Sequence, residues 1–525
     1  MINKLRRNIF SILLFLILPV LLTGQELIME SGSNYHRMES LTIQNGEINP
    51  SLSVRLSHVW QLKARKQFAD LLKSRKFDGL LRKQRLKFFP SLSGITYLNG
   101  GNVNQKGTYL DIYPSVTVAA NYKIPPTGRF SVLFWSRIEK HSVVSQETIS
   151  DLTYDFHGQK ELGYQKNQGW DSTWVEYDIG DGGILFSHSK GYITLAKSNP
   201  IWGPGYSGQL IFSDKIPSFV FFKVIHQISE KWTFSFFHGS LNSTLRDSST
   251  VELYQMKGGL PLVKKFIAAH RLDFFPTKSV RIGLGESVIY GARGIEGVYL
   301  IPFMLYWSAQ HDLSDSDNLQ MFADIDWVIK EKARFYGSLF MDEWDLVNTF
   351  NKKKNHNWIA YQIGATLRLP VKPIFDPLFR LEYTHLSPYV YVHKSKINTF
   401  QNHGRYLGFW AGPNSDNLFV AIEGTPKPGW WIQVYGQKTR RGEVDDETIK
   451  MQYNNELITF LYRTYEGEPE TRSLVGFRGE FGLTSYFRLG FDIYRDRWDQ
   501  KLDLTTGKRK TVKKLNGKIE ILLGI

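Results

Sequence analysis

Residues 357–370 read Asn-Trp-Ile-Ala-Tyr-Gln-Ile-Gly-Ala-Thr-Leu-Arg-Leu-Pro, and their side chains alternate between apolar and polar. One face carries Ile359, Tyr361, Ile363, Ala365, Leu367 and Leu369, and the other carries Gln362, Gly364, Thr366 and Arg368. Strict alternation over this length predicts a β-strand with one apolar and one polar face. A lipid-facing apolar side and a lumen-facing polar side are typical of a strand in a transmembrane barrel.

The same alternation continues from Phe88 to the end of the chain. It is clearest in residues 486–498 and 515–525, and it recurs in residues 109–122, 129–139, 183–196, 231–241, 266–275, 278–290, 321–329, 332–341, 378–386, 404–411, 417–424, 429–438 and 473–484. A soluble sandwich also alternates, but its apolar face turns inward and its outer face is mixed. Here the polar positions include Arg, Asp, Glu and Lys, which fits a water-filled or polar-packed lumen. Roughly 440 residues, at about 20 to 25 per strand and loop, predict about 18 antiparallel strands.

The composition agrees with an all-β transmembrane barrel. The chain has 525 residues, of which 14% are aromatic and 44 are glycine. No apolar run after the N-terminus is long enough for a helical span, which excludes a polytopic helical membrane protein. There are no cysteines. A disulfide scaffold, a Cys-ligated metal site, a Cys nucleophile and an N-terminal lipid anchor are therefore excluded.

Residues 1–24 have the layout of a cleaved secretory signal peptide. Lys4, Arg6 and Arg7 precede an apolar stretch over residues 9–22. The rival interpretation is an uncleaved anchor helix, but the stretch is short and contains a proline. The net charge of +15 becomes 15 − 3 = +12 without these three cations. A basic chain favours anionic partners such as lipopolysaccharide phosphates or an acidic glycan, and secretion excludes nucleic acid.

Residues 25–86 precede the predicted barrel of residues 87–525 and divide into two parts. Residues 25–50 are polar and loop-like, whereas residues 52–86 hold apolar residues at helix-like spacing and are strongly basic. We expect residues 52–86 to form a helical periplasmic or plug segment. Its basic faces are either solvated or packed in the lumen, or else they contact an anionic glycan or lipid.

Tryptophans gather at the ends of the predicted strands: Trp170, Trp174, Trp202, Trp327, Trp344, Trp358, Trp410, Trp430, Trp431 and Trp498. Aromatic girdles at the two membrane interfaces explain such positions without any binding role. A platform on which sugar rings stack uses the same residue type. The girdle is the simpler interpretation for any single tryptophan.

No catalytic or cofactor motif is present: the chain has no HExxH, no P-loop and no GxSxG, and we predict no catalytic residue, cofactor or metal. Residues 199–214 stand out instead, because their prolines and glycines specify a tight loop between strands. This loop is either a rigid turn folded into the lumen or a preformed aromatic site for a sugar.

Within this loop, Trp202-Gly-Pro-Gly205 followed by Gly208-Gln-Leu-Ile-Phe-Ser213 resembles the signature of the Wzi-like capsule assembly family. Further pieces agree in order: His270-Arg-Leu-Asp-Phe274, Gly285-Glu-Ser-Val-Ile-Tyr-Gly-Ala-Arg293, Tyr299-Leu-Ile-Pro302, Asp317-Asn318, Asp324, Asp342-Glu343, Glu382-Tyr-Thr-His-Leu-Ser-Pro-Tyr389 and Gly412-Pro-Asn-Ser-Asp416. The resemblance covers about residues 90 to 525 and is greatest to the version carried by Bacteroides-type bacteria.

The resemblance implies an outer-membrane barrel of about 18 strands with a small helical N-terminal part on the periplasmic side. It also implies a lectin-like protein, not an enzyme, that binds capsular or other surface polysaccharide and helps to hold it at the cell surface. Barrel closure leaves no open sheet edge, so we expect a monomer. The other expected partners are outer-membrane lipids, lipopolysaccharide and capsule export machinery. The candidate structural or glycan-binding residues are Trp202, Gly203, Pro204, Gly205, Tyr206, Gly208, His270, Arg271, Glu286, Arg293, Asp342 and Glu343. A pore or transporter for glycans or small solutes is the alternative, and a barrel hydrolase is a third class.

Overall fold

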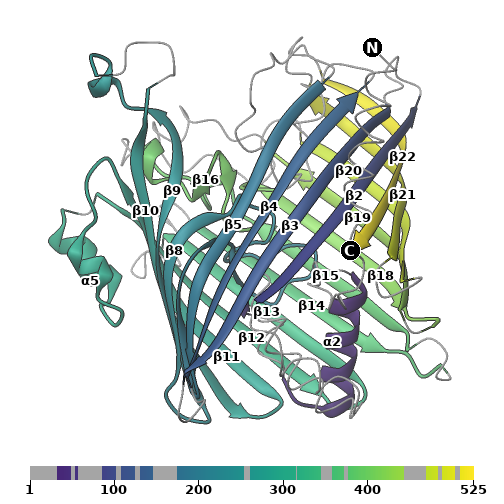
Figure 1. The fold of residues 1–525 in the computed structure, drawn as a ribbon, viewed down its shortest axis with the longest axis horizontal. Helices are drawn as coiled ribbons and strands as arrows, with labels where there is room; N and C mark the ends of the chain where they lie inside the picture. The colour runs from purple at the N-terminus through teal and green to yellow at the C-terminus, as the bar shows by residue number, and fades with distance from the viewer. Residues whose placement is uncertain are drawn as a thin grey trace, which may run out of the picture.

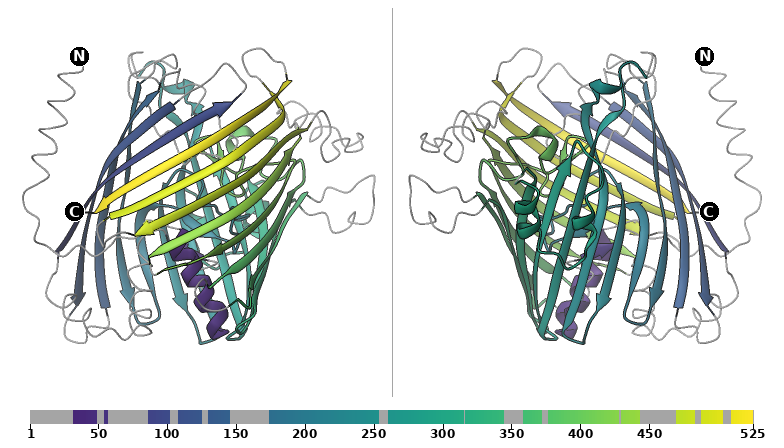
Figure 2. Two further views of the ribbon diagram at one scale, coloured as in Figure 1. Left: turned by 90° about the vertical axis from the view of Figure 1, so that its right-hand side faces the viewer. Right: turned by 90° about the vertical axis from the view of Figure 1, so that its left-hand side faces the viewer.

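The computed structural model describes residues 32–48, 54–56, 86–101, 108–124, 130–145, 174–253, 260–314, 316–343, 358–371, 376–427, 429–442, 469–482, 487–502 and 509–524. Within these residues, eighteen strands form one closed antiparallel barrel (Figures 1 and 2). The strand number predicted from the sequence is confirmed. The expected signal peptide and nearly all of the basic segment 52–86 lie outside the described residues.

The barrel strands follow one another around the wall in chain order. They are β2 (Leu86–Gly101), β3 (Thr108–Ile124), β4 (Phe130–Ser145), β5 (Trp174–His188), β6 (Gly191–Ser198), β8 (Phe219–Gln227), β9 (Trp232–Arg246), β10 (Leu262–Thr277), β11 (Val280–Gly291), β12 (Asn318–Ile329), β13 (Ala333–Glu343), β14 (Trp358–Arg368), β15 (Leu378–Leu386), β18 (Ser415–Gly424), β19 (Trp430–Arg441), β20 (Glu470–Gly482), β21 (Phe487–Leu502) and β22 (Arg509–Gly524). The last strand pairs with the first, Ser91 facing Gly524 and Gly101 facing Lys514, which closes the sheet. Closure leaves no open edge along the wall.

Burial along the strands is reversed relative to a soluble protein. On β14, Gln362 and Thr366 are fully buried toward the lumen, whereas Ile363 is 58% exposed on the outside. On β12, Asp324 is buried beside the exposed Ile325. An apolar outer face and a polar inner face are the pattern of a barrel in lipid, and they exclude the soluble sandwich. The protein is an outer-membrane-type β-barrel.

The two ends of the barrel differ in their connections. At one end the turns are short, as between His188 of β5 and Gly191 of β6, and outer-membrane barrels place such turns on the periplasmic side. Outward aromatic pairs lie near this end, including Trp232 with Phe274 at 4.3 Å between ring centroids. Trp327 also lies there, exposed, and fits the predicted girdle. Four other tryptophans named for the girdle are instead buried: Trp202, Trp358, Trp431 and Trp498. The long connections lie at the opposite, outer end.

Several sequence predictions need correction. Residues 404–411 contain only β17 (Arg405–Tyr406), which pairs with β16 (Gln401–Asn402) inside the lumen and not in the wall. Residues 183–196 are not one strand but cross the turn between β5 and β6. Both segments alternate because one face of each meets an apolar surface and the other face meets a polar one. Alternation alone does not show what the apolar surface is.

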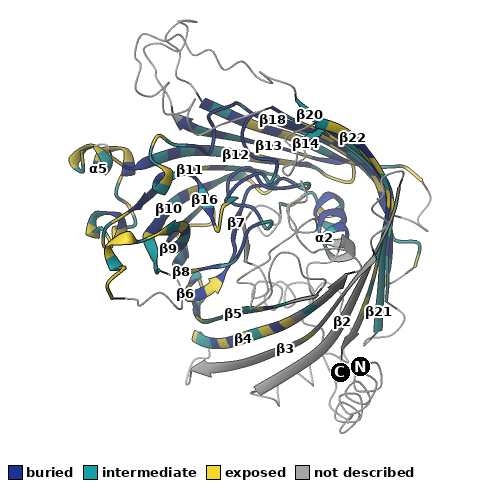
Figure 3. Ribbon diagram, turned by 90° about the horizontal axis from the view of Figure 1, so that it is seen from above, coloured by how far each residue is buried: buried dark blue, intermediate teal, exposed yellow. Residues whose placement is uncertain are grey.

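The N-terminal helix also lies elsewhere than expected. Residues 25–50, predicted to be loop-like, contain α2 (Gly32–Asn45), which stands inside the barrel (Figure 3). Within the predicted helical segment 52–86, β1 (Val54–Leu56) is instead extended and pairs with β7 (Pro200–Trp202). Among the described helices, none is both long and apolar enough to cross a membrane.

The lumen is filled in two layers. At the outer end, a core of buried aromatic and aliphatic residues surrounds Trp202, Phe212 and Phe400. Trp202, Phe212 and Phe400 come from two connections that fold inward, residues 199–218 between β6 and β8 and residues 387–414 between β15 and β18, and they pack on inward residues of the wall strands. At the periplasmic end the lumen holds α2 and a network of buried charges.

The outer face predicts how the wall responds to charge. We expect Ile363→Arg to destabilise the barrel by about 2 to 4 kcal/mol, because an arginine near the bilayer midplane costs that much. The measurement is the urea midpoint for folding into phosphatidylcholine vesicles. Leu253→Arg is the control, since Leu253 is exposed in the connection after β9. Equal midpoints for the two variants would contradict a lipid-facing position for Ile363.

Candidate functional site

The inward loop of residues 199–214 is a rigid turn folded into the lumen, the first of the two alternatives for this segment. Trp202 is fully buried, and its backbone exchanges hydrogen bonds of 3.0 and 3.1 Å with Phe212. Gly203 has a φ of +119°, which favours glycine. A side chain at Gly205 would put its Cβ 2.2 Å from Oε1 of Gln362 on the wall. These two glycines let the loop turn sharply and lie directly against β14.

The tip of the loop is fixed by carboxylates of the wall. The backbone N–H groups of Tyr206 and Ser207 donate to the two oxygens of Glu382, at 2.6 and 3.0 Å. The Tyr206 ring lies 3.7 Å from the guanidinium of Arg380, and its hydroxyl accepts a 3.2 Å hydrogen bond from Arg478. Burial raises the pKa of Tyr206 to about 12. Tyr206 is therefore a neutral hydrogen-bonding group at physiological pH.

The second inward loop, residues 387–414, packs on the first. The hydroxyl of Tyr391 donates to the carbonyl oxygen of Leu210 and accepts from the N–H of Phe409 at 3.1 Å. The indole N–H of Trp410 donates to the carbonyl of Ser207 at 3.0 Å. Asp342 accepts the backbone N–H of Tyr391, so this predicted site residue anchors the second loop to β13. The two loops form one interlocked lining.

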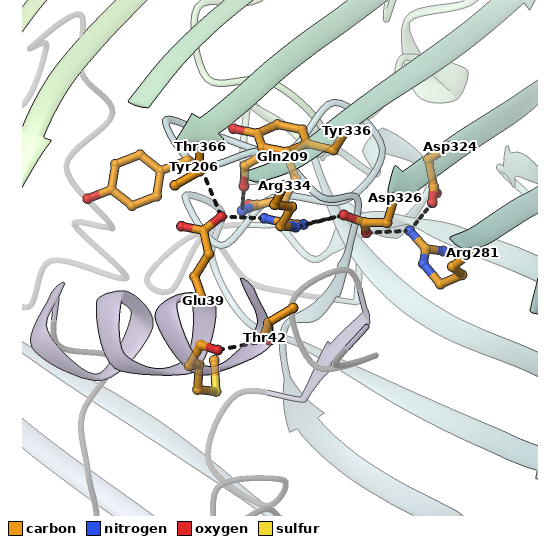
Figure 4. Close-up of polar contacts among 12 residues, drawn as sticks. Glu39, Thr42, Tyr206, Gln209, Arg281, Asp324, Asp326, Arg334, Tyr336 and Thr366 are labelled. Carbon is orange, nitrogen blue, oxygen red and sulfur yellow. Dashed lines mark hydrogen bonds and ion pairs between the residues drawn. The ribbon is translucent and has the colours of Figure 1, made fainter. Parts of the chain in front are cut away.

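Helix α2 lies in the periplasmic half of the lumen, where a buried carboxylate of the helix holds it to the wall. Glu39 accepts from Nη1 of Arg334 at 2.8 Å and lies 2.6 Å from Nη2 of Arg380, while the Thr366 hydroxyl donates to it at 3.0 Å (Figure 4). Around it, His36 lies 3.3 Å from Glu423 and Ser40 donates to Asp376.

Burial alone would raise the pKa of Glu39. The positive charges of Arg380 and Arg334 outweigh burial and hold the pKa of this carboxyl below its usual value of 4.5. Glu39 is therefore ionised at neutral pH.

The Glu39 site is one end of a chain of buried ion pairs along the wall. Arg334 also donates to Asp326 at 2.7 Å, and Arg281 bridges Asp326 and Asp324 (Figure 4). Asp273 accepts from Arg281 at 2.7 Å and from Arg271 at 2.6 Å. Arg271 and Asp273 both lie on β10, and each of the other links joins neighbouring strands, from β10 to β13. We call this set, with Glu39, Arg380 and Glu423, the lumen ion network.

The structure separates the residues that the sequence grouped into one candidate site. Trp202 and Arg271 meet in the lumen, with the guanidinium 5.5 Å from the ring centroid. His270, Glu286 and Arg293 lie on the opposite side of the wall, outside the barrel and away from the lumen. Glu343 ends β13, and its side chain lies outside the description.

Sequence reasoning missed the members of the network that hold α2. Glu39, Arg334, Arg380 and Glu423 carried no motif. The available signal was weak: Arg334, Arg380 and Glu423 occupy polar positions of alternating segments, where a charge must face the lumen. In the described part of the chain, no group of His, Asp and Glu side chains is arranged to hold a metal ion.

Comparison with known proteins places the fold. No protein family and no curated protein matches the sequence. Among solved structures, the chain is similar to Wzi of Escherichia coli, a carbohydrate-binding β-barrel involved in group 1 capsule assembly. The TM-score is 0.56 at 12% identity, covering 94% of this chain and 98% of Wzi. The chain therefore has a Wzi-like outer-membrane barrel fold.

Two porin-like barrels match at lower similarity. One is OpdQ of Pseudomonas aeruginosa, with a TM-score of 0.46 and 7% identity over 84% of this chain and 99% of OpdQ. The other is OccAB4 of Acinetobacter baumannii, with a TM-score of 0.45 and 8% identity over 85% of this chain and 99% of OccAB4. Neither likeness bears on the role of this chain.

The contacts of Glu39 predict that Glu39→Gln loosens α2. Removing one charge of a buried ion pair costs about 3 kcal/mol, because the partner cations remain in the lumen. The chain has no cysteine, so a nitroxide on Asn45→Cys reports on the helix alone. Its spectrum should sharpen in Glu39→Gln. The matched control is Glu47→Gln, whose pair with Lys278 is exposed and worth little. Identical spectra in both variants would contradict the electrostatic attachment.

The lowered pKa of Glu39 predicts that acid releases α2. A carboxyl whose pKa is lower in the docked state stabilises docking fully above its usual value of 4.5, and loses that contribution as the pH falls through the lowered pKa. We expect the Asn45→Cys label to gain mobility as the pH falls below about 4.5. In Glu39→Gln this response should be smaller. An equal acid response in both proteins would assign the effect to other carboxylates.

Proposed function

We propose that this protein is a surface-polysaccharide binding protein of the Wzi-like capsule assembly type, in its Bacteroides-type version, that helps to assemble or retain glycan at the cell surface. The observation that supports the proposal is the protein that lies inside the barrel. Two interlocked loops lie in the outer half of the lumen and α2 lies in the periplasmic half, each fixed by buried hydrogen bonds or ion pairs. A protein that holds polymer outside the membrane requires no open path through its barrel.

The proposed ligand is an anionic polysaccharide. The chain is basic, with +12 after removal of the leader cations, as 15 − 3. Lys and Arg pair with uronate or phosphate groups, and aromatic rings stack on the apolar faces of sugars. Binding at each repeat is expected to be weak and salt-sensitive, with strength gained over many repeats. We propose a monomeric, non-enzymatic protein that contacts lipopolysaccharide and capsule export machinery, with no nucleic-acid partner.

The test is deletion of the gene, followed by measurement of cell-bound and shed polysaccharide. We expect the total to stay constant while polysaccharide moves from the cells into the medium. Loss of both fractions, with accumulation in the periplasm, would instead assign the protein to export. No change in either fraction would contradict the proposed role in glycan binding, but it would not contradict the barrel fold.

Conductance separates binding from the alternative role as a pore. In planar bilayers the purified barrel should show no sustained large openings, because the inward loops and α2 both lie inside the lumen. Glu39→Gln, which weakens the attachment of α2, should add at most brief openings, since the loop layer stays in place. Sustained openings of the unmodified protein would overturn the binder and favour a solute pore.

A further inference from the structure

The connection between β11 and β12 does not project from the barrel end. Residues 292–314, here called the outer flap, fold back onto the outside of the wall and contain η4 (Gly297–Leu300) and α5 (Tyr306–Asp312). Figures 1 and 3 show α5 outside the ring of strands, beside β10 and β11. The flap therefore covers part of the surface that faces lipid in an outer-membrane barrel.

The inner side of the flap covers polar groups on the lipid side of the wall. His270 and Glu286 face each other on β10 and β11, 3.0 Å apart, and both point outward. The same Glu286 oxygen accepts the backbone N–H of Tyr306 at 2.7 Å. At the flap's ends, Asp317 accepts from Arg293 at 2.6 Å and from the Tyr299 hydroxyl at 2.7 Å. A bare carboxylate against hydrocarbon costs several kcal/mol, so the flap shields this pair.

Apolar packing joins the same two surfaces. Tyr299, Tyr306 and Ala309 of the flap are buried against the outward residues of the two strands, Phe266, Ala268, Val288 and Tyr290. Phe303 stacks on Phe234 of β9 with ring centroids 4.2 Å apart. The flap is thus packed against the wall along its length.

The outer side of the flap carries a group of exposed apolar side chains, and its exposed polar residues Ser308, His311 and Asp312 lie on α5. Phe303 is 72% exposed, Leu305 65% and Trp307 58%, and Leu300 and Ile301 are also exposed. The exposed wall residues Leu272 and Leu284 continue this surface on β10 and β11. Contiguous apolar surface of this kind marks an interaction site, and here it is continuous with the lipid-facing band.

The position of the flap along β10 places it at the depth of the bilayer. Strands rise about 3.3 Å per residue. With a tilt of about 40°, they gain roughly 2.5 Å per residue along the membrane normal. His270 then lies about 10 Å, and Phe266 about 20 Å, above the girdle residue Phe274, within an apolar band about 25 Å tall. The flap covers the wall between those two levels, from near the middle of the membrane to its outer part.

We propose that the outer flap is a lipid-binding surface whose exposed apolar side chains lie among the acyl chains of the outer leaflet, while Glu286 and His270 hold its inner side to the wall. Transfer of large apolar side chains from water into acyl chains is favourable, so several such residues anchor this side of the barrel in the outer leaflet.

The test uses nitroxide labels on single cysteines in the full-length, cysteine-free protein, folded into phosphatidylcholine vesicles. Labels at Phe303→Cys and Leu305→Cys should collide more often with oxygen, which dissolves in lipid, than with a water-soluble nickel chelate. Leu284→Cys on the wall is the lipid control, and Leu253→Cys in the outer connection is the water control. Retention of the heat-sensitive folded band on a gel confirms that each variant is folded.

Two outcomes would overturn the lipid assignment. A flap label that prefers the nickel chelate, as Leu253→Cys does, would place the flap in water. A label shielded from both reagents, with spin–spin broadening between molecules, would place a second copy of the chain on the flap.

Glu286→Gln tests the attachment. The Phe303→Cys label should become more mobile in this variant and still favour oxygen, because the flap loosens but stays in the bilayer. Unchanged mobility of the Phe303→Cys label would contradict the proposal that Glu286 holds the flap to the wall.

Discussion

The ionised carboxylate of Glu39 between Arg334 and Arg380 is the contact on which the closed periplasmic half of the barrel depends. An unpaired charge in a packed interior costs several kcal/mol, so each lumen-facing charge requires a partner. From Arg271 to Arg334 the wall supplies its own partners between neighbouring strands. At Arg334 and Arg380 the helix contributes the shared anion. The helix and the wall are therefore joined by buried charges, and without Glu39 the arginines Arg334 and Arg380 keep the wall carboxylates Asp326 and Glu423 as their ion-pair partners.

The sequence predicts the wall well, because each strand meets two different environments. Alternation follows wherever one face meets lipid and the other meets the lumen, as at Gln362 and Ile363. The same pattern failed for residues 404–411, whose apolar face packs on the lumen core and not on lipid. Helix α2 was missed for a different reason, because its buried side is polar. The buried side of that helix carries His36, Glu39 and Ser40, so no apolar stripe marks it as a helix that packs.

The loop of residues 199–214 was predicted to be rigid from its prolines and glycines, and Gly203 and Gly205 explain why. Its place inside the barrel depends on distant partners such as Glu382, which local sequence does not reveal. The separation of His270 from Arg271 was readable in principle. Successive residues on a strand point to opposite faces, so two adjacent polar residues cannot both face the lumen. One of them must meet lipid or a cover, and the outer flap is that cover.

The two layers of the lumen also constrain where the proposed polysaccharide ligand is held. A chain passing through the barrel would have to displace the aromatic lining around Trp202 and then α2, which are held by different forces. Opening the first layer exposes buried rings to water, and opening the second leaves Arg334 and Arg380 without their shared carboxylate. A ligand bound at the outer end disturbs neither layer. The energetic cost of threading, set by the fixed packing of the lumen, thus favours a glycan held on the outer surface over one that crosses the wall.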